Sequence, residues 1–400
     1  MIPLSSNTAF GKLIFRLPFM TVCKLFLHDQ MPPYKIKEDP AMETITVNLK
    51  EREYPIHIAP EGWEALPNAI RGTIRGKKAM AVCDENTYRL YYGAVKTALE
   101  NAGCSVYPAV IPPGEASKSF EQAQALYTRA LEAKLNRSSI IVALGGGVVG
   151  DLAGFIAATY MRGIGFIQIP TSLLAQVDSS VGGKVAINHP LAKNIIGAFY
   201  QPHMVFINPH TLKTLPPREF STGMAELIKH AFIADSDFIT WLEQNMEVVL
   251  SRDVAALTHA LYRSCSIKAR VVEQDERESG LRMILNFGHT VGHAIESITG
   301  YSKYTHGEAV AMGMVYEATL ALHMGLIGQE YIRRISSLLE RAGLPTVLEA
   351  ADWSSILQRM AYDKKNVDSG ITFALPTGYG KVEVFKGVAM DGIRQALAGK

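Results

Sequence analysis

Three histidines, His289, His293 and His306, lie close together in the second half of the 400-residue sequence. His289 and His293 are four residues apart, so on a helix both side chains lie on one face and can aim at one metal ion. Asn286 and Arg282 precede them on the same stretch. A lone histidine is more often a satisfied polar group of the core. The cluster favours a divalent-metal site with nitrogen and oxygen ligands, and the spacing predicts both His289 and His293 as ligands.

A second cluster of ionisable residues falls on a predicted helix. Helical spacing puts Glu226, Lys229 and His230 on one face of that helix. The structural alternative is an ordinary ion pair between Glu226 and Lys229, which stabilises a helix by only about 0.2–0.5 kcal/mol. The spacing alone leaves both interpretations open.

A glycine-rich turn follows a buried strand in the first half of the chain. Residues 140–151 read IIVALGGGVVGD and formally satisfy the pattern GxGxxG. Glycines let the backbone approach a pyrophosphate, and the N–H groups at a helix start attract anions by about 0.3–1 kcal/mol each. Alternatively, the glycines only pack helix on strand. The ribose-binding acid expected after the next strand is missing from 166–172, so Asp84 is the better candidate, with a plain helix N-cap as its alternative.

Two lysines and a carboxylate occupy a poorly helical stretch rich in glycine. Asp178, Lys184 and Lys193 surround Gly182-Gly183, and Asn194 ends the stretch. Such a segment can close over a phosphate and a substrate. Its structural alternative is a loop whose lysines face water, the commoner position of lysine.

The elements that must position these residues form two groups. From about residue 43 to 210, short β-rich runs alternate with stretches of 3.6-residue apolar spacing, which predicts an α/β layer with parallel strands. The clearest strands are 78–83, 140–144 and 166–169, and the clearest helices are 88–102 and 120–135. Helices then dominate, at 222–234, 238–250, 254–273, 288–298, 308–324 and 329–342, before a hairpin over 371–385. We therefore predict an α/β domain over 42–215 and a mainly α-helical domain over 216–400.

Composition excludes several classes of protein. The net charge of +2 argues against a protein that grips nucleic acid. The four cysteines form no CxxC pair, which indicates a reducing cytoplasm and neither a disulfide framework nor a thiolate zinc site. No uninterrupted apolar stretch is long enough to predict a membrane-spanning helix. The pattern of predicted strands and helices begins near Met42. We therefore expect residues 1–41 to be a poorly ordered N-terminal extension, although they resemble a weak targeting leader.

Taken together, the motifs resemble those of the 3-dehydroquinate synthase family. The similar segments are ALGGGVVGDLAGF from residue 143, ATYMRG from 158, QVDSSVGGK from 176, GMAELIK from 223 and LNFGHTVGHA from 285. The resemblance extends over essentially residues 42–400. It implies an N-terminal nucleotide-binding α/β domain, a helical C-terminal domain, an active site in the cleft between them and a homodimer. It also implies two cofactors, NAD and a divalent metal, with zinc favoured and cobalt as the alternative.

Residue by residue, the resemblance implies three sets of contacts. The metal ligands would be Glu226, His289 and His306, which moves His293 from the metal to the substrate side. The substrate's carboxylate, hydroxyls and phosphate would be held by His293, Arg162, Asp178, Lys184, Lys229, Lys268, Arg282, Asn286 and one of Lys364 and Lys365. NAD would contact Asp84, Asn86, Glu115, Lys118, Gly146, Gly147, Asp151, Thr171, Ser172, Lys184, Lys193 and Asn194.

The implied reaction belongs to the shikimate pathway and converts 3-deoxy-D-arabino-heptulosonate 7-phosphate, a small sugar-acid phosphate, into 3-dehydroquinate. NAD oxidises the substrate transiently at C5, phosphate leaves by elimination, the same NADH reduces the product, and an intramolecular aldol step closes the ring. No net oxidation results. A bound metal would acidify a substrate hydroxyl, and His293 would relay protons from the C5 oxygen.

Three other functions compete with this one. Another sugar phosphate cyclase, such as a 2-deoxy-scyllo-inosose synthase, would share the cofactors, but Lys268, Arg282 and Asn286 match the dehydroquinate-forming pattern. A metal-dependent polyol dehydrogenase of the same fold would release its NADH. A non-catalytic NAD-binding regulator would require a broken set of metal ligands, whereas all three implied ligands are present.

Overall fold

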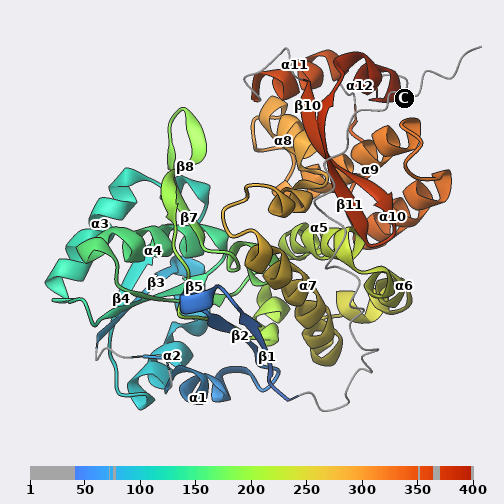
Figure 1. The fold of residues 1–400 in the computed structure, drawn as a ribbon. Coiled ribbons are helices and arrows are strands. Elements are labelled where there is room, and N and C mark those ends of the chain that lie inside the picture. Colours follow the sequence, from blue (N-terminus) through green and yellow to red (C-terminus); the bar gives the residue numbers. More distant parts are fainter. Residues whose placement is uncertain (1–40, 72, 75–77, 350–351, 364–369, 398–400) are drawn as a thin grey trace, which may run out of the picture. The chain divides into compact units, whose positions relative to one another are not determined.

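The computed structural model describes residues 41–71, 73–74, 78–349, 352–363 and 370–397, all within one compact unit (Figure 1). Residues 1–40 of the predicted extension lie outside the described residues, as do Lys364 and Lys365. Among the described residues, no helix has both the length and the apolar character needed to cross a bilayer.

A seven-stranded sheet forms the N-terminal part, in the order β1-β2-β9-β6-β5-β3-β4. β1 and β2 pair antiparallel at one edge, and all other neighbours in this sheet are parallel. The carboxyl ends of its parallel strands therefore point the same way and gather the loops that follow them. The strands are β1 (Glu43–Val47), β2 (Tyr54–Ile58), β3 (Lys78–Asp84), β4 (Ser105–Ile111), β5 (Ile140–Gly145), β6 (Gly165–Pro170) and β9 (Met204–Ile207).

Helices cover both faces of this sheet, above and below it in Figure 1. Every residue of β5 is buried, as expected for a central parallel strand. Alternate residues of β5 face opposite cores: Ile141 packs with α3 and α4, and Val142 packs with α1 and α2. The four helices are α1 (Leu66–Arg71), α2 (Glu85–Asn101), α3 (Phe120–Glu132) and α4 (Gly147–Thr159).

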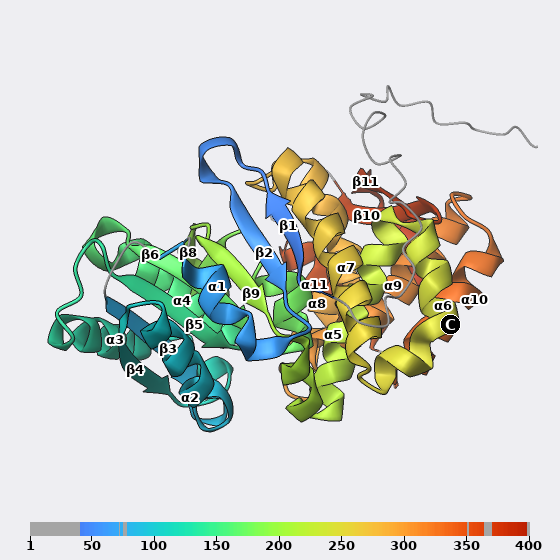
Figure 2. The ribbon, with the colours of Figure 1, turned by 90° about the horizontal axis from the view of Figure 1, so that it is seen from below.

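Short elements connect the sheet to the rest of the chain. β7 (Lys184–His189) and β8 (Ala192–Phe199) form a separate antiparallel hairpin. Single helical turns are η1 (Lys50–Arg52), η2 (Gly62–Glu64), η3 (Glu115–Ser117), η4 (Tyr160–Arg162), η5 (Ala175–Ser179), η6 (Pro209–Thr214) and η7 (Leu281–Asn286). Figure 2 shows β1 beside α7, where Asn48 N–H donates to Glu273 Oε1 at 2.6 Å.

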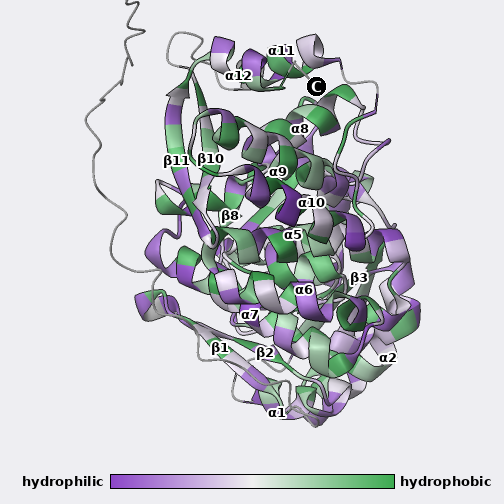
Figure 3. Ribbon diagram, turned by 90° about the vertical axis from the view of Figure 1, so that its right-hand side faces the viewer, coloured by the Kyte–Doolittle hydropathy of each residue, from purple (hydrophilic) through white to green (hydrophobic). Residues whose placement is uncertain are grey.

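The C-terminal part is mainly α-helical and is built around α9. Fourteen of the 18 residues of α9 are buried, because α5, α8, α10, α12 and β10 all pack against it. The more peripheral α10 is amphipathic and shows hydrophilic, purple segments in Figure 3. The elements are α5 (Pro217–Ala234), α6 (Ser236–Leu250), α7 (Val254–Gln274), α8 (His289–Ile298), α9 (His306–His323), α10 (Gln329–Arg341), α11 (Trp353–Asp363), α12 (Met390–Leu397) and the hairpin β10 (Ile371–Gly378)–β11 (Lys381–Val388).

The predicted fold class is confirmed, and the element boundaries shift for identifiable reasons. α5 begins at Pro217 rather than at 222, since proline suits a first turn whose N–H has no helical partner. α9 begins at His306 rather than at 308, because Thr305 and Glu308 form a capping box. Helices α11 and α12 were not predicted, and the poorly helical stretch around Lys193 forms the β7–β8 hairpin, which was not predicted either. The predicted domain boundary at 215/216 stays a prediction.

Candidate active site

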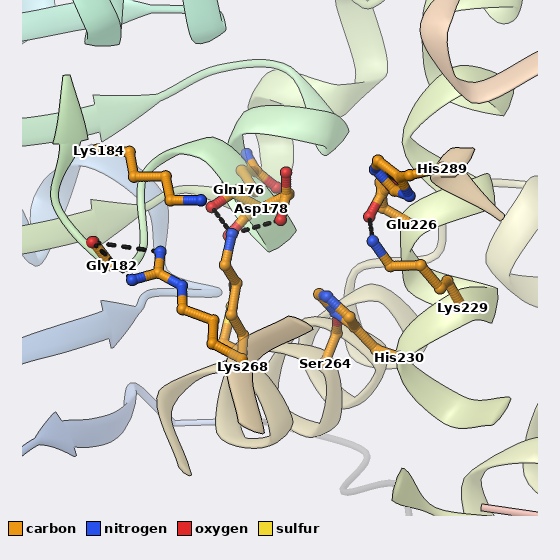
Figure 4. A network of polar contacts seen from close by, with 12 residues as sticks. Gln176, Asp178, Gly182, Lys184, Glu226, Lys229, His230, Ser264, Lys268 and His289 are labelled. Carbon is orange, nitrogen blue, oxygen red and sulfur yellow. Dashed lines mark hydrogen bonds and ion pairs between the residues drawn. The ribbon is translucent and has the colours of Figure 1, made fainter. Parts of the chain in front are cut away.

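Three side chains from three helices converge on one point in the C-terminal part. Glu226 lies in the middle of α5, while His289 and His306 are the first residues of α8 and α9. Glu226 Oε1 lies 3.6 Å from Nε2 of each imidazole, and one donor atom from each residue lies within 4.8 Å of the others. Figure 4 shows Glu226 and His289 facing each other. The structure thus brings together the three ligands implied by the family resemblance.

Helical spacing predicted His289 and His293 as a pair of metal ligands. In the structure, the two histidines that face Glu226 are His289 and His306. The His293 ring centre lies 5.2 Å from that of His289. A donor atom of His293 instead groups with His306 and Glu296. His289 is the first residue of α8 and its Nε2 lies 3.6 Å from Glu226 Oε1, whereas His293 lies one turn further along the helix.

The environment of Glu226 fits a bound cation. Its side chain is fully buried, and Oε1 accepts no hydrogen bond from any described residue, which is costly for a buried carboxylate. Lys229 forms an ion pair with the other oxygen. Burial alone would raise the pKa of Glu226, but the Lys229 ammonium and the two imidazoles hold it well below its usual range. An ionised oxygen facing two imidazole nitrogens is a donor set suited to a divalent metal.

Secondary contacts orient both imidazoles. His289 Nδ1 lies 3.3 Å from the Phe287 carbonyl oxygen, and His306 Nδ1 lies 3.4 Å from Glu296 Oε2. In each ring this leaves Nε2 facing Glu226, the usual arrangement for a ligand histidine. Burial lowers the pKa of His306, but the carboxylates of Glu226 and Glu296 raise it to about 10 overall. A positive charge between these two carboxylates is therefore strongly favoured.

A second polar network lies where η5 meets α7 (Figure 4). Lys268 forms an ion pair with the Asp178 carboxylate and donates to the Asp178 carbonyl at 2.5 Å. Burial alone would raise the pKa of Asp178, but Lys268 holds it below its usual range, so Asp178 is ionised. Arg282 donates to the carbonyls of Gly182 at 3.3 Å and Glu276 at 2.5 Å. Predicted substrate residues from both halves of the sequence are thus held together.

Glu278 is a site residue that the sequence analysis missed. It forms an ion pair with Lys184 and accepts a hydrogen bond from Asn286 Nδ2 at 2.8 Å. Its backbone has φ +58°, in a turn whose N–H groups at Ser279 and Gly280 donate to Asp275. A single glutamate in the charged run 273–278 carries no sequence signal of this role.

A cavity of about 700 Å³ brings several predicted residues to one space. Lys184, Asn286, His289 and His293 line one side of it. Unpredicted residues from α11, β10 and β11 complete the wall, among them Arg359, Thr372, Phe373, Val384 and Lys386. The cavity is large enough for a small sugar-acid phosphate.

The predicted nucleotide residues gather around the start of α4. Gly146 is the N-cap of α4, and no side chain caps this helix. Thr171 N–H donates to the Gly145 carbonyl at 3.0 Å, which places the Thr171–Ser172 turn beside the glycines. Lys118, nearly fully buried, binds Asp151 Oδ2 at 2.7 Å and also Asn194 Oδ1. Glu115, beside them, accepts a hydrogen bond from Asn188 at 2.8 Å.

The other predicted residues of this part are Asp84, Asn86, Lys193 and Arg162. Asp84 is the last residue of β3, where its neighbour Cys83 lies opposite Leu144, just before the glycine turn. Asp84 is the N-cap of α2 and accepts hydrogen bonds from the N–H groups of Asn86 and Thr87. These are the contacts of a plain helix N-cap, which is the alternative to the predicted ribose-binding role of Asp84. Lys193, on the β7–β8 hairpin, lies 3.9 Å from the ring centre of Tyr301. Arg162 follows the C-terminal end of α4, roughly 20 Å along that helix from its glycine start, and is exposed. The structure does not bring Arg162 to the cavity.

Comparisons with known proteins agree along the chain. Residues 108–222 match the family model "3-dehydroquinate synthase N-terminal", and residues 223–366 match "3-dehydroquinate synthase C-terminal". The chain is 51% identical to the 3-dehydroquinate synthase of Caldanaerobacter subterraneus subsp. tengcongensis, over 86% of this chain and 96% of that protein. It is 53% identical to the enzyme of the same name from Desulforamulus reducens, over 89% of this chain and 100% of the relative.

Solved structures of related cyclases share the fold. A 2-deoxy-scyllo-inosose synthase complexed with carbaglucose-6-phosphate, NAD+ and Co2+ has a TM-score of 0.80 and 27% identity, over 89% of this chain and 100% of that one. The 2-epi-5-epi-valiolone synthase of Streptomyces hygroscopicus subsp. jinggangensis, with NAD+ and Zn2+ bound, has a TM-score of 0.78 and 25% identity, over 86% and 96%. An NADH-dependent butanol dehydrogenase from Thermotoga maritima, with a TM-score of 0.60 and 15% identity over 86% and 96%, shares the fold alone.

Proposed function

The chain belongs to the 3-dehydroquinate synthase family, and we propose that it converts 3-deoxy-D-arabino-heptulosonate 7-phosphate into 3-dehydroquinate and phosphate. It is thus a phosphate-eliminating cyclase, a carbon–oxygen lyase that works with NAD and a divalent metal. The observation that carries the proposal is the buried Oε1 of Glu226, which faces the Nε2 atoms of His289 and His306.

Glu226, His289 and His306 would hold the metal ion. We favour zinc, with cobalt as the alternative, because two imidazoles and one carboxylate form a common catalytic zinc set with open positions. The metal would supply a Lewis acid for the substrate hydroxyls, and NAD would supply a reversible hydride acceptor. Lys229, paired with Glu226, keeps that carboxylate ionised and available as a ligand.

The anionic groups of the substrate would be bound by side-chain donors that converge on Glu278. Lys184 and Asn286 both bind the carboxylate of Glu278, so their donors point to one place. A substrate carboxylate or phosphate can take the same donors in charge-assisted hydrogen bonds. Lys268 and Arg282 stand beside this position and would extend the binding surface for the substrate's other groups.

His293 would move the substrate's proton. It lines the cavity next to His289, and an imidazole can both accept and return a proton near neutral pH. Asp178, held ionised by Lys268, would accept a hydrogen bond from a substrate hydroxyl.

NAD would lie along the carboxyl ends of the parallel strands. Its pyrophosphate would meet the uncapped start of α4 at Gly146 and Gly147. The group formed by Lys118, Asp151 and Asn194 stands beside that start. The other contacts would come from Asp84 and Asn86 at the end of β3, from Glu115, Thr171, Ser172 and Lys184, and from Lys193 once it leaves Tyr301.

We propose that the enzyme is a cytoplasmic homodimer. The described cysteines Cys83, Cys104 and Cys265 are buried and form no disulfide with one another, as expected in a reducing compartment. Arg162 does not line the cavity of its own chain, but a second copy could present its Arg162 there. A dimer would therefore reconcile the exposed position of Arg162 with its proposed contact to the substrate.

Purified protein incubated with the heptulosonate phosphate, NAD and zinc tests the proposal. We expect phosphate and dehydroquinate in equal amounts and no accumulation of NADH. Stoichiometric NADH with glycerol would instead indicate a polyol dehydrogenase. Turnover of glucose 6-phosphate in place of the heptulosonate would indicate a different sugar phosphate cyclase.

A further inference from the structure

Helix α8, which carries His289 and His293, begins without a cap of its own. Its N-cap residue is Gly288, which has φ +83° and no side chain to accept a hydrogen bond. The first N–H groups of a helix have no partner inside it and need an acceptor when buried. The acceptor must therefore come from another element.

Glu317, on α9, provides that acceptor. Gly288 N–H donates to Glu317 Oε2 at 2.7 Å, and Val291 N–H donates to Oε1 at 3.1 Å. The Glu317 side chain is fully buried, in the middle of the C-terminal core. A carboxylate at a helix N-terminus is also favoured by the helix dipole. Both of its oxygens thus hold the first turn of α8.

Close glycine contacts remove the remaining freedom between the two helices. A Cβ added to Gly313 would lie 1.9 Å from the Gly288 carbonyl oxygen, and one added to Gly292 would lie 3.1 Å from the Ala309 carbonyl oxygen. The backbones of α8 and α9 therefore approach very closely at these two points. Glu317 bonds the start of α8 at one end of this contact, and His306 begins α9 at the other.

This arrangement links Glu317 to the two histidines of the proposed metal site. His289 immediately follows Gly288, so the position of the first turn of α8 sets where His289 Nε2 lies relative to His306. Metal ligands tolerate only about 0.2 Å of error in distance, so a small displacement of that turn weakens binding. We propose that Glu317 is a positioning residue that holds His289 in the geometry needed to bind the metal. This inference rests on the metal site proposed above.

The test compares metal affinity and stability in Glu317→Gln, Glu317→Ala and a matched control. In Glu317→Gln one carboxylate oxygen becomes an NH2 group that cannot accept from an N–H, while volume is preserved. We expect zinc affinity of the apoprotein, measured by competition with a chromophoric chelator, to fall about 10- to 100-fold. The Co2+ absorption spectrum should change as well, because His289 shifts. The control Asp235→Ala removes the side-chain N-cap of α6, its bond to Phe238 N–H and its ion pair with Arg263, away from the metal-site histidines, and should lower stability with zinc affinity unchanged.

The outcomes separate the two proposals. If Glu317→Gln folds and binds zinc with wild-type affinity and an unchanged Co2+ spectrum, the positioning role is refuted and Glu317 only stabilises the fold. If the wild-type protein itself binds no divalent metal, the proposed metal site fails instead. Should Glu317→Ala not fold, the glutamine variant decides the question.

Discussion

Glu226 and Lys229, three residues apart on α5, form an ion pair whose side chains are 0% and 2% exposed. A surface pair at this spacing contributes little, but here both charges are removed from water and one carboxylate oxygen is left facing two imidazoles. The burial of this ion pair is therefore better explained by a third charge, a divalent cation, than by a contribution of the pair to helix stability.

Glu226→Gln tests this directly. The amide keeps the shape but loses the negative charge that would bind the metal, so we expect bound zinc to fall from about one per chain to near zero and turnover to fall at least about 100-fold. Metal analysis and the phosphate-release assay measure the two effects. Glu243→Gln, on α6, removes the ion-pair partner of Arg334 on α10 and should leave both unchanged. Full metal content and turnover in Glu226→Gln would instead show that Glu226 does not hold the metal.

Asp151 predicts a pH dependence of stability in the NAD-free protein. Burial raises the pKa of Asp151 to about 6, although Lys118 opposes the shift. Its pKa in the unfolded chain is about 3.9, so folding favours the neutral acid: the stabilisation is complete below pH ~4 and is lost as the pH rises through about 6. From pH 5 to 7.5 the free energy of unfolding should fall by about 1 kcal/mol more in wild type than in Asp151→Asn. Urea titrations at both pH values measure this, and equal slopes in the two proteins would contradict the prediction.

Two glycine-to-alanine changes with opposite expected effects test the α8–α9 contact. Gly313→Ala would place a methyl group 1.9 Å from the Gly288 carbonyl oxygen, so we expect the helices to separate and the protein to lose at least about 2 kcal/mol of stability. Gly93→Ala, in α2, meets no atom within 4 Å and should be neutral or stabilising by up to about 1 kcal/mol. Thermal melts compare the two variants. Similar melting temperatures would show that α8 can shift freely on α9.

Arg162 predicts recovery of activity when two inactive variants are mixed. If the substrate is bound by Arg162 of a second copy, Arg162→Ala and Glu226→Gln should each be inactive, but a mixed dimer would contain one complete site. Random re-pairing of equal amounts should then restore about a quarter of wild-type activity. Separate unfolding and refolding of each variant is the control. No recovery in a verified mixed dimer would argue that Arg162 acts in its own chain or has no role.

Local patterns in the sequence predicted most of the elements. β5 is a continuous apolar run between turn residues, and α5, α7 and α10 carry apolar periodicity long enough to identify each as a helix. The β7–β8 hairpin escaped prediction because most of β8 is exposed and lacks the alternation that marks a half-buried strand. The capping-box pattern of Thr305 and Glu308 can be recognised in the sequence, and it would have placed the start of α9 at His306.

The amino-acid sequence by itself determined the residue types of the site, the glycine turn, the order of α/β and helical parts and, through its motifs, the family. Spacing alone favoured His289 with His293, and the resemblance implied Glu226, His289 and His306. Only the tertiary structure shows that the donor atoms of this second set lie close together across three helices. The tertiary structure alone revealed the roles of Glu278 and Glu317. No periodic pattern in the sequence marks the pairs that they form with their hydrogen-bond partners. The physical reason is that helical spacing specifies a face, whereas the point at which faces meet depends on how closely the helices pack.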